Sequence, residues 1–251
     1  MTIPLQKDII YGPLKSRRFG TSLGVNLLPK NKKICNFNCV YCQYSQSRLT
    51  KNAVFPTVQE IEEEMTQFAL KAKKQGRAID WITIAGNGEP TLHPKFPEVV
   101  KRLLSVRDAF LPGVPVGILS NSSTCHRLEI RQALARLDGR FMKLDAGSPA
   151  VFKNINRPLG FAEWGEVASG LRELKNIVLQ SLFFEGDERN IAPSQVGDWI
   201  HAVGRIQPKS VQIYTIDRPT QLEGLRPVSK DSLQRIASDM TRQTGVPGDV
   251  Y

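Results

Sequence analysis

The sequence lacks the features that mark several classes of protein. No stretch of its 251 residues approaches the roughly 18 consecutive apolar residues of a membrane-spanning helix, so we expect no membrane association. Its first residues, MTIPLQKDIIYG, contain no apolar run of the kind found in secretion signals, which predicts a cytoplasmic protein. No internal repeat, low-complexity tract or long linker interrupts the chain. With 41% hydrophobic and 23% charged residues, the sequence predicts a single globular domain over residues 1–251.

Cysteine is scarce, and the cysteines that occur are clustered. Four are present, too few for a disulfide scaffold, and three of them, Cys35, Cys39 and Cys42, form a C-x3-C-x2-C segment that indicates a metal site. A structural zinc site usually takes four cysteine or histidine ligands, but the segment holds no histidine and the chain's three histidines lie far away in sequence. Three thiolates can instead hold three irons of a [4Fe–4S] cluster and leave one iron without a protein ligand, whereas an electron-transfer cluster takes four cysteines.

Acidic residues are fewer than basic ones. The chain has 34 lysines and arginines against 24 aspartates and glutamates, a formal charge of +10. Such a charge favours nucleic acid or an anionic surface as a partner. The basic residues are dispersed, however, and no run of five or six like charges forms a tail. RNA binding is therefore one hypothesis, and solvated helix faces are the other explanation for this charge.

Apolar residues alternate between strand-like runs and helical spacing. Six short apolar runs are predicted as strands, and each is followed by a predicted helix, the first with a capping box formed by Thr57 and Glu60. This alternation predicts an α/β fold with a parallel sheet, either an open doubly wound sheet or an incomplete barrel, with ligands beyond the carboxyl ends of the strands. The predicted strands are residues 23–28, 80–85, 114–120, 140–145, 177–184 and 210–215, and the predicted helices are residues 58–74, 96–104, 126–137, 161–174, 193–206 and 230–244.

The cysteine segment, CNFNCVYC, resembles the signature of the radical S-adenosylmethionine (SAM) enzymes, in which an aromatic residue, here Tyr41, precedes the last cysteine. The resemblance implies an incomplete (β/α)6 TIM-like barrel at about residues 20–220, with a short N-terminal segment and a C-terminal helix. It implies a [4Fe–4S] cluster on the three cysteines, with SAM bound to the open iron. In that family the reduced cluster splits SAM into methionine and a 5′-deoxyadenosyl radical, which abstracts hydrogen from a substrate.

Other motifs resemble the family at successive strand ends. The segment AGNGEPTLHP is similar to the glycine-glycine-glutamate motif, which implies that Gly88 and Glu89 contact the SAM amino group, although Asn87 stands where many members have a small residue. Glycine permits close approach of a ligand to the backbone, and a carboxylate pairs with an ammonium group. The alternative for each further residue is an ordinary structural role. The resemblance implies cofactor contacts from Ser120 and Asn121, from Asp145 to the adenosyl ribose, and from Arg157 to the SAM carboxylate, with Ser181, Phe183 and Tyr214 lining the adenine or substrate pocket.

Two more segments, YGPLKSRRFGTSLGVN and IYTIDRP, resemble a subgroup of small iron–sulfur oxidoreductases similar to the wyosine-forming tRNA enzymes. Within the first, Ser16, Arg17 and Arg18 are predicted either to meet a phosphate or substrate carboxylate or to form a basic edge of the barrel. The substrate stays open between an RNA base, a small molecule and a protein side chain, the last including glycyl-radical activation. A reducing flavodoxin or ferredoxin is the expected electron donor. The non-enzymatic alternative is an iron–sulfur electron carrier or scaffold.

Overall fold

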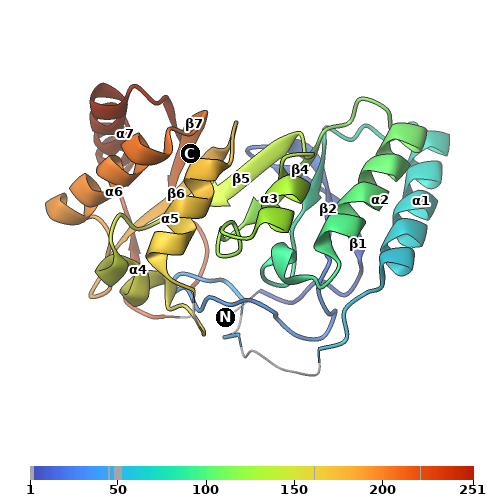
Figure 1. Ribbon diagram of the computed structural model, residues 1–251, viewed down its shortest axis with the longest axis horizontal. Helices are drawn as coiled ribbons and strands as arrows, with labels where there is room; N and C mark the ends of the chain where they lie inside the picture. The colour runs from blue at the N-terminus through green and yellow to red at the C-terminus, as the bar shows by residue number, and fades with distance from the viewer. Residues whose placement is uncertain (1–2, 45, 48–52, 161, 221) are drawn as a thin grey trace.

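The computed structural model describes residues 3–44, 46–47, 53–160, 162–220 and 222–251. Strands and helices alternate along most of this length, as Figure 1 shows. The strands are β1 (Ile10–Ser16), β2 (Gly20–Val25), β3 (Trp81–Ile84), β4 (Val116–Ser120), β5 (Gly139–Lys143), β6 (Val178–Glu185), β7 (Ser210–Thr215), β8 (Arg226–Pro227) and β9 (Gly248–Val250). The helices are α1 (Val58–Lys74), the 3-10 turn η1 (Pro90–Leu92), α2 (Phe96–Phe110), α3 (Leu128–Leu134), α4 (Pro149–Asn156), α5 (Trp164–Glu173), α6 (Pro193–Ile206) and α7 (Lys230–Thr244).

The sheet follows the order of the chain. Strands β2 to β7 lie side by side in sequence order and are all parallel, which confirms the predicted parallel α/β fold. Strand β1 is antiparallel beside β2, β9 is parallel beside β7, and β8 pairs with the end of β6. Helices α1 and α2 lie beside one end of the sheet, and α6 and α7 lie beside the other (Figure 1). The arrangement is a partial (β/α) barrel in which the parallel strands β2 to β7 have their carboxyl ends on one side.

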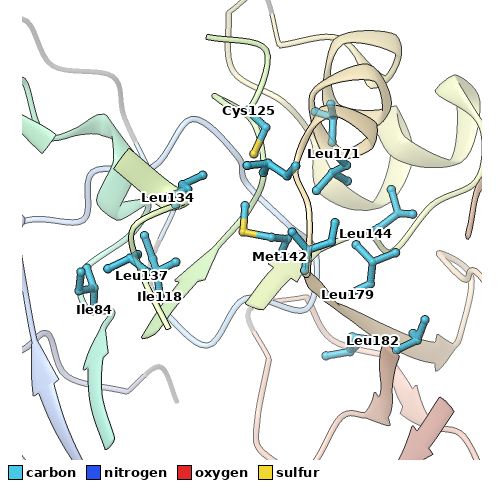
Figure 2. Close-up of a cluster of buried hydrophobic side chains, with 14 of the residues drawn as sticks. Ile84, Ile118, Cys125, Leu134, Leu137, Met142, Leu144, Leu171, Leu179 and Leu182 are labelled. Atoms are coloured by element: carbon cyan, nitrogen blue, oxygen red, sulfur yellow. The ribbon is translucent and has the colours of Figure 1, made fainter. Parts of the chain in front are cut away.

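One face of the sheet forms the apolar core. Successive side chains of a strand point to opposite faces, so alternate residues of β3, β4 and β5 bring Ile84, Ile118 and Met142 to the same side. Figure 2 shows these side chains in one cluster with Leu134 of α3 and Leu171 of α5, and all five are buried. Burying an aliphatic side chain of this size contributes about 1.5–3 kcal/mol. The covering helices are therefore held by the outward-facing residues of the strands.

The other face of the sheet carries several buried polar groups. The Ser22 hydroxyl on β2 lies 2.7 Å from the Thr83 hydroxyl on β3, and both residues are buried. On the far side of the barrel, Gln180 of β6 donates to Gln212 of β7 at 2.8 Å. Buried polar groups of this kind need partners inside the protein. The inner face therefore includes hydrogen-bonded polar groups beside its apolar side chains, whereas branched aliphatic residues dominate the interior of a closed barrel.

Several boundaries differ from the sequence prediction. The run over residues 23–28 was predicted as one strand, but β2 ends at Val25 because Asn26 turns the chain: its side-chain oxygen accepts from the Leu28 N–H at 3.3 Å, and its amide donates to the Leu28 carbonyl. The capping box of Thr57 and Glu60 is confirmed. Strands β1, β8 and β9 and helix α4 were not predicted, and residue 161, the predicted start of α5, lies outside the described residues. Among the residues described, no helix combines the length and apolar character that crossing a bilayer requires.

Candidate active site

The loop from Cys35 to Cys42, here called the cysteine loop, is attached to the turn that follows β3. Ile34, directly before Cys35, forms a parallel bridge with Gly88. The Ile34 N–H donates to the Asn87 carbonyl at 2.9 Å, and the Glu89 N–H donates to the Ile34 carbonyl at 2.9 Å. Backbone pairing of this kind fixes both segments at once, because each contributes a donor and an acceptor. The cysteine segment and the glycine-glutamate turn therefore lie side by side at the carboxyl end of β3.

Only glycine fits at position 88. Its φ of +137° is a conformation that residues with a side chain rarely adopt, and an added Cβ would lie 1.9 Å from the Ile34 carbonyl oxygen. Asn87, by contrast, points away from the cysteine loop. Its side-chain amide donates to the carbonyls of Gln6 and Pro29, both at 2.9 Å, and its side-chain oxygen accepts from the Gln6 N–H. The unusual asparagine in the motif thus anchors the N-terminal segment.

Glu89 is surrounded by donors from its own chain. One carboxylate oxygen accepts from the Thr91 N–H, the Thr91 hydroxyl and, at 2.9 Å, the Ser120 hydroxyl. The other accepts from the Asn121 N–H at 2.5 Å. The side chain is 1% exposed. Burial raises the pKa of Glu89, and the bonds from Thr91, Asn121 and Ser120 oppose that rise. Glu89 therefore ties the ends of β3 and β4 together, and its predicted contact with the SAM amino group stays a prediction.

Each of the three clustered cysteines receives a nitrogen donor from a different part of the chain. The Asn121 side-chain amide lies 3.5 Å from the Cys35 sulfur, and the Asn156 amide lies 3.5 Å from the Cys39 sulfur. The Lys33 ammonium lies 3.2 Å from the Cys42 sulfur, and Lys33 is buried. These donors come respectively from the end of β4, the end of α4 and the residues before the loop. Such donors stabilise negative charge on sulfur, so the three positions suit thiolates that bind a metal cluster.

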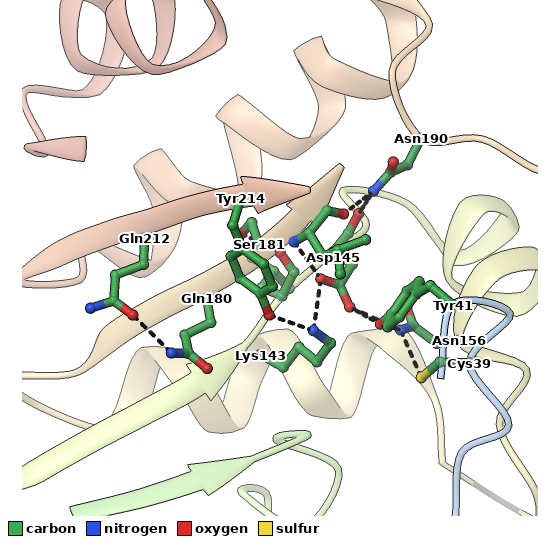
Figure 3. Close-up of polar contacts among 12 residues, drawn as sticks. Cys39, Tyr41, Lys143, Asp145, Asn156, Gln180, Ser181, Asn190, Gln212 and Tyr214 are labelled. Atoms are coloured by element: carbon green, nitrogen blue, oxygen red, sulfur yellow. Dashed lines mark hydrogen bonds and ion pairs between the residues drawn. The ribbon is translucent and has the colours of Figure 1, made fainter. Parts of the chain in front are cut away.

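A second group of predicted residues meets around Lys143 (Figure 3). The Tyr41 hydroxyl donates to one Asp145 carboxylate oxygen, which also accepts from the Asn156 amide at 3.1 Å. The Lys143 ammonium lies 3.4 Å from the other Asp145 oxygen, donates to the Tyr214 hydroxyl at 2.9 Å, and lies 4.9 Å from the centre of the Tyr41 ring. The cysteine loop is thereby connected to β5, α4 and β7. The Asp145 oxygens are occupied by protein donors, and its predicted ribose contact stays a prediction.

Burial and neighbouring charges shift the pKa values of several residues in this site. Burial alone would lower the pKa of Lys143, but Asp145 and Tyr214 outweigh it and hold that pKa above its usual value. Burial, followed by the Asp145 charge, raises the pKa of Tyr41, so its hydroxyl keeps its proton and donates. Burial also raises the pKa of Cys35 to about 12 and raises that of Cys39. Both thiols are therefore protonated at neutral pH until a metal displaces the proton.

Arg157 stands at the rim of the site. It follows α4 in a left-handed conformation with φ of +46°, and its backbone carbonyl accepts from the Asn38 N–H of the cysteine loop at 3.0 Å. Its guanidinium forms an ion pair with Glu188 at 3.1 Å. Arg157 and Cys39 both line a surface cavity of about 360 Å³. The residue is beside the cysteine loop, but its side chain is engaged with the protein, and its predicted contact with the SAM carboxylate stays a prediction.

Two residues proposed from the sequence face the wrong side of the sheet for a pocket. Ser181 is fully buried, donates to the Leu144 carbonyl at 2.6 Å and accepts from the Trp199 ring nitrogen. Phe183 packs edge-on against Trp199 of α6, with ring centres 5.0 Å apart. Both belong to the outer core, whereas Leu182 between them lines an inner cavity. The period-two alternation of a strand decides this, and applying it to β6 would have avoided the error.

Sequence reasoning also missed Lys33, Lys143 and Asn156. Lys143 was detectable, because it lies two residues before Asp145 and therefore shares its face of the strand. Asn156 lies on a helix that was not predicted, and no local pattern connects it to Cys39 or Tyr41.

The chemistry of the donor set fits an iron–sulfur cluster better than a single ion. Among the described residues, no three histidine, cysteine, aspartate or glutamate side chains converge closely enough to hold one metal ion. A structural zinc site usually takes four cysteine or histidine ligands, and the loop offers three cysteines and no histidine. A [4Fe–4S] cluster spreads its irons over a larger volume, takes thiolate ligands, and is stabilised by N–H donors to its sulfurs. Cys35, Cys39 and Cys42 offer these thiolates, each with its own donor.

Comparison with known proteins supports the same interpretation. A family model described as the radical SAM superfamily matches residues 33–189, which include the cysteine loop and the residues gathered around it by β3, β4, β5 and α4. The chain belongs to the radical SAM superfamily. Membership implies an enzyme that uses a [4Fe–4S] cluster and SAM, which argues against an electron carrier or scaffold.

Relatives of this radical SAM protein have been recorded in several bacteria. The chain is 31% identical over 232 residues to a UPF0026 protein of Helicobacter pylori J99, covering 90% of this chain and 71% of that one. It is 30% identical over 236 residues to a Brachyspira hyodysenteriae protein named GTPase Obg, covering 92% of this chain but 33% of that protein. The chain thus spans a third of this second relative's length. Among solved structures, one of TYW1 with a lysine-pyruvate adduct bound has a TM-score of 0.67 at 12% identity, covering 90% of this chain and 76% of that one, which shows a shared fold.

Proposed function

We propose that this protein cleaves SAM reductively at a [4Fe–4S] cluster held by Cys35, Cys39 and Cys42. A [4Fe–4S] cluster held there would supply one electron for breaking the carbon–sulfur bond of SAM, which would release methionine and leave a 5′-deoxyadenosyl radical to take a hydrogen atom from a substrate. The observation that carries the proposal is the bridge between Ile34 and Gly88, which joins the cysteine loop to the turn that resembles the family's SAM-binding motif. Tyr41, which also belongs to the cysteine loop, connects the same site to the inner face of the barrel through its hydrogen bond to Asp145.

The residues of this chain have separable tasks in that reaction. The three nitrogen donors at the cysteine sulfurs stabilise the negative charge of the site. Glu89 fixes the relative position of two strand ends through its four accepted bonds. Asp145 holds the Lys143 ammonium and the Tyr41 hydroxyl in place on the inner face. Together these groups orient a cofactor at the carboxyl ends of β3, β4 and β5, where ligands of parallel α/β folds bind.

Formation of 5′-deoxyadenosine tests the proposal. The chain is reconstituted anaerobically with iron and sulfide, reduced with dithionite and incubated with SAM, and the products are separated by chromatography. We expect 5′-deoxyadenosine and methionine from the wild type and neither product above background from the variant with Cys35, Cys39 and Cys42 all replaced by alanine. The Cys125→Ala variant is the control, because that thiol is fully buried in the apolar core. Undiminished product from the triple variant would disprove the assignment.

A tRNA base is the first candidate substrate. The +10 charge supports an RNA partner, and the shared fold with TYW1 is consistent with the sequence resemblance to wyosine-forming enzymes. If tRNA binds through phosphate contacts, its affinity falls steeply as salt rises, because bound counterions are released. Filter binding of bulk tRNA between low and physiological salt checks this. Binding that is absent, or that does not change with salt, would remove tRNA as the substrate.

A small molecule is the second candidate, and the dimensions of the barrel interior favour it. Two cavities on the inner side have volumes of about 230 and 310 Å³. Pockets for small-molecule ligands range from about 300 to 1,000 Å³, and the larger of the two cavities reaches the lower end of that range, so it suits a compact molecule. To find such a substrate, fractions of low-molecular-mass cell extract are added to the reaction. A fraction that contains the substrate should raise the rate of 5′-deoxyadenosine release above the rate without substrate.

A flavodoxin or ferredoxin is proposed as the electron donor. The surface cavity beside Cys39 carries Lys153 and Arg157 at its rim, and a basic rim suits the acidic surface of such donors. Replacing Lys153 by glutamate is expected to slow reduction by flavodoxin without slowing reduction by dithionite. Equal slowing with both reductants would contradict a role in docking.

A further inference from the structure

The inner face of the barrel carries a group of cations around two adjoining cavities. Arg17, Arg18 and Arg218 border both the cavity of about 230 Å³ and the cavity of about 310 Å³. Tyr214 lines the first of these, and so does Tyr41, the residue before Cys42. The space next to the three arginines therefore reaches the cysteine loop. A molecule bound there would lie on the inner side of the site described above.

Arg18 is held in a defined position by aromatic rings. Its guanidinium carbon lies 5.0 Å from the centre of the Tyr214 ring and 5.7 Å from that of Phe19, both within the range of a cation–π contact. Phe19 itself packs against Phe141 and Trp81, with ring centres 4.5 and 5.7 Å apart. These three rings form an aromatic floor under the arginine.

The backbone fixes the same arrangement. The Ser16 hydroxyl accepts from the N–H groups of Arg18 and Phe19, each at 3.2 Å, and so shapes the turn between β1 and β2. Gly20 completes this turn in a left-handed conformation with φ of +60°. The Arg18 side chain is therefore presented to the cavities by an ordered turn and is supported on two sides by rings.

Arg18 is half-buried, and part of its guanidinium lacks a hydrogen-bond partner. One of its terminal nitrogens, Nη1, is buried and has no hydrogen-bond partner among the described residues. A guanidinium stays charged at any ordinary pH, and leaving a buried polar nitrogen without an acceptor costs free energy. The neighbouring cations differ in this respect, because Arg17 is paired with Asp217 and Lys143 with Asp145. Arg218, the third arginine on these cavities, is exposed to solvent, so the buried nitrogen without a partner in this group belongs to Arg18.

We propose that Arg18 binds the carboxylate or phosphate group of a small substrate inside the barrel. An oxyanion is the ligand that supplies acceptors to a guanidinium in a two-point geometry, and it would give the buried Nη1 the acceptor that it lacks. The Tyr214 ring beside the guanidinium and the Tyr41 ring lining the same cavity offer surface to the rest of the molecule. This role as a substrate site depends on the proposed SAM chemistry, whereas the binding of an oxyanion does not.

Thermal unfolding with simple oxyanions tests the site without SAM or turnover. The reconstituted protein is titrated anaerobically with sodium phosphate in one arm and sodium acetate in the other, with sodium chloride holding the ionic strength constant. A ligand that binds the folded state raises the unfolding temperature in a saturable way, from which Kd follows. We expect saturable stabilisation by at least one anion. Stronger binding of phosphate would identify a phosphate monoester as the substrate group, and stronger binding of acetate would identify a carboxylate.

Two variants decide whether Arg18 carries the effect. Arg18→Gln is expected to weaken oxyanion binding at least about tenfold, the loss typical of a charge-assisted hydrogen bond. Arg18→Lys, which keeps the charge but loses the forked geometry, should bind with intermediate affinity and serves if the first variant does not fold. The control is Arg235→Gln on α7, which removes an equal charge from an exposed helix face and should leave Kd unchanged.

Three results would overturn the proposal. They are no saturable stabilisation of the wild type by either anion, unchanged binding in both Arg18 variants, and an equal loss in the Arg235 control. SAM affinity is measured separately, and a loss of SAM binding in Arg18→Gln with oxyanion binding intact would also overturn it. Because no outcome depends on 5′-deoxyadenosine, failure here is distinct from failure of the proposed SAM cleavage.

Discussion

The Lys33 ammonium should raise the reduction potential of the cluster. It lies 3.2 Å from the Cys42 sulfur and is buried, so its charge is only weakly screened. Reduction adds one electron to the cluster, and a nearby positive charge stabilises the reduced form relative to the oxidised form. The variant Lys33→Gln retains a side chain of similar polarity but removes the charge. We therefore expect its cluster to be harder to reduce.

The order of magnitude of the shift follows from Coulomb's law for a charge in contact with a cluster ligand. A unit charge about 5 Å from an added electron interacts with it by roughly 3 kcal/mol at an effective dielectric constant of 20. The electron is shared over the whole cluster, so we take about 1–2 kcal/mol as the difference, which corresponds to about 40–90 mV for a one-electron couple. Asn121→Ala and Asn156→Ala remove neutral donors from the other two sulfurs and should lower the potential by about half as much each.

A redox titration followed by electron paramagnetic resonance measures these potentials. Lys30→Gln is the matched control, because Lys30 is an exposed residue of the same segment and is paired with Glu64 at 3.4 Å. Lys33→Arg keeps the charge and should keep most of the potential. A potential that is unchanged or raised in Lys33→Gln, or lowered equally in Lys30→Gln, would refute the argument that the buried ammonium tunes the cluster.

Two further predictions concern the loop attachment and the stability of the fold. Gly88→Ala should lower the free energy of unfolding by about 3 kcal/mol or more and abolish cluster incorporation, because the new Cβ would collide with the Ile34 carbonyl. Urea unfolding measures the first effect, and iron content measures the second. The control is Gly197→Ala in α6, where a Cβ meets nothing within 4 Å, and this variant should be neutral or slightly stabilising. Normal iron content in Gly88→Ala would contradict the importance of the bridge. Burial lowers the pKa of His93 in the folded protein below the usual 6.5. As the pH falls below 6.5, the unfolded chain therefore binds more protons than the folded chain does. The free energy of unfolding should decrease by up to about 1.4 kcal/mol per pH unit until the pH reaches the lowered pKa. Denaturation of His93→Gln at several pH values should show a smaller slope, and an identical slope would exclude His93 as its source.

The sequence predicts the parts of the fold that are encoded by local patterns. Helix α1 was placed at its observed bounds, because its apolar spacing and its capping box act within a few residues of each other. Strand β1 was missed, because most of its side chains are at least partly exposed and it has no buried face to produce a pattern. Strand β9 has three residues and includes a glycine, which leaves too little signal for either periodicity.

In the candidate site, too, the sequence predicts the parts that are contiguous and misses those that come from distant segments. The cysteine spacing and the glycine-glutamate turn are contiguous motifs, so the sequence identifies them, and the family match supports that identification. The donors to the sulfurs are not contiguous with the motif. Asn156 reaches Cys39 from a position 117 residues further along the chain, and this pairing exists only once α4 is packed against the loop. Tertiary structure therefore determines the electrostatic surroundings of the cysteines, and a motif cannot report them.

The central claim is that three cysteines of this chain hold a cluster with one iron open to SAM. Electron paramagnetic resonance of the reduced, reconstituted protein, recorded before and after addition of SAM, tests it most directly. The account predicts a single [4Fe–4S] signal whose g-values change on adding SAM, and its loss when Cys35, Cys39 and Cys42 are replaced. A reduced cluster whose signal is identical with and without SAM, or one that persists in the triple variant, would contradict the account.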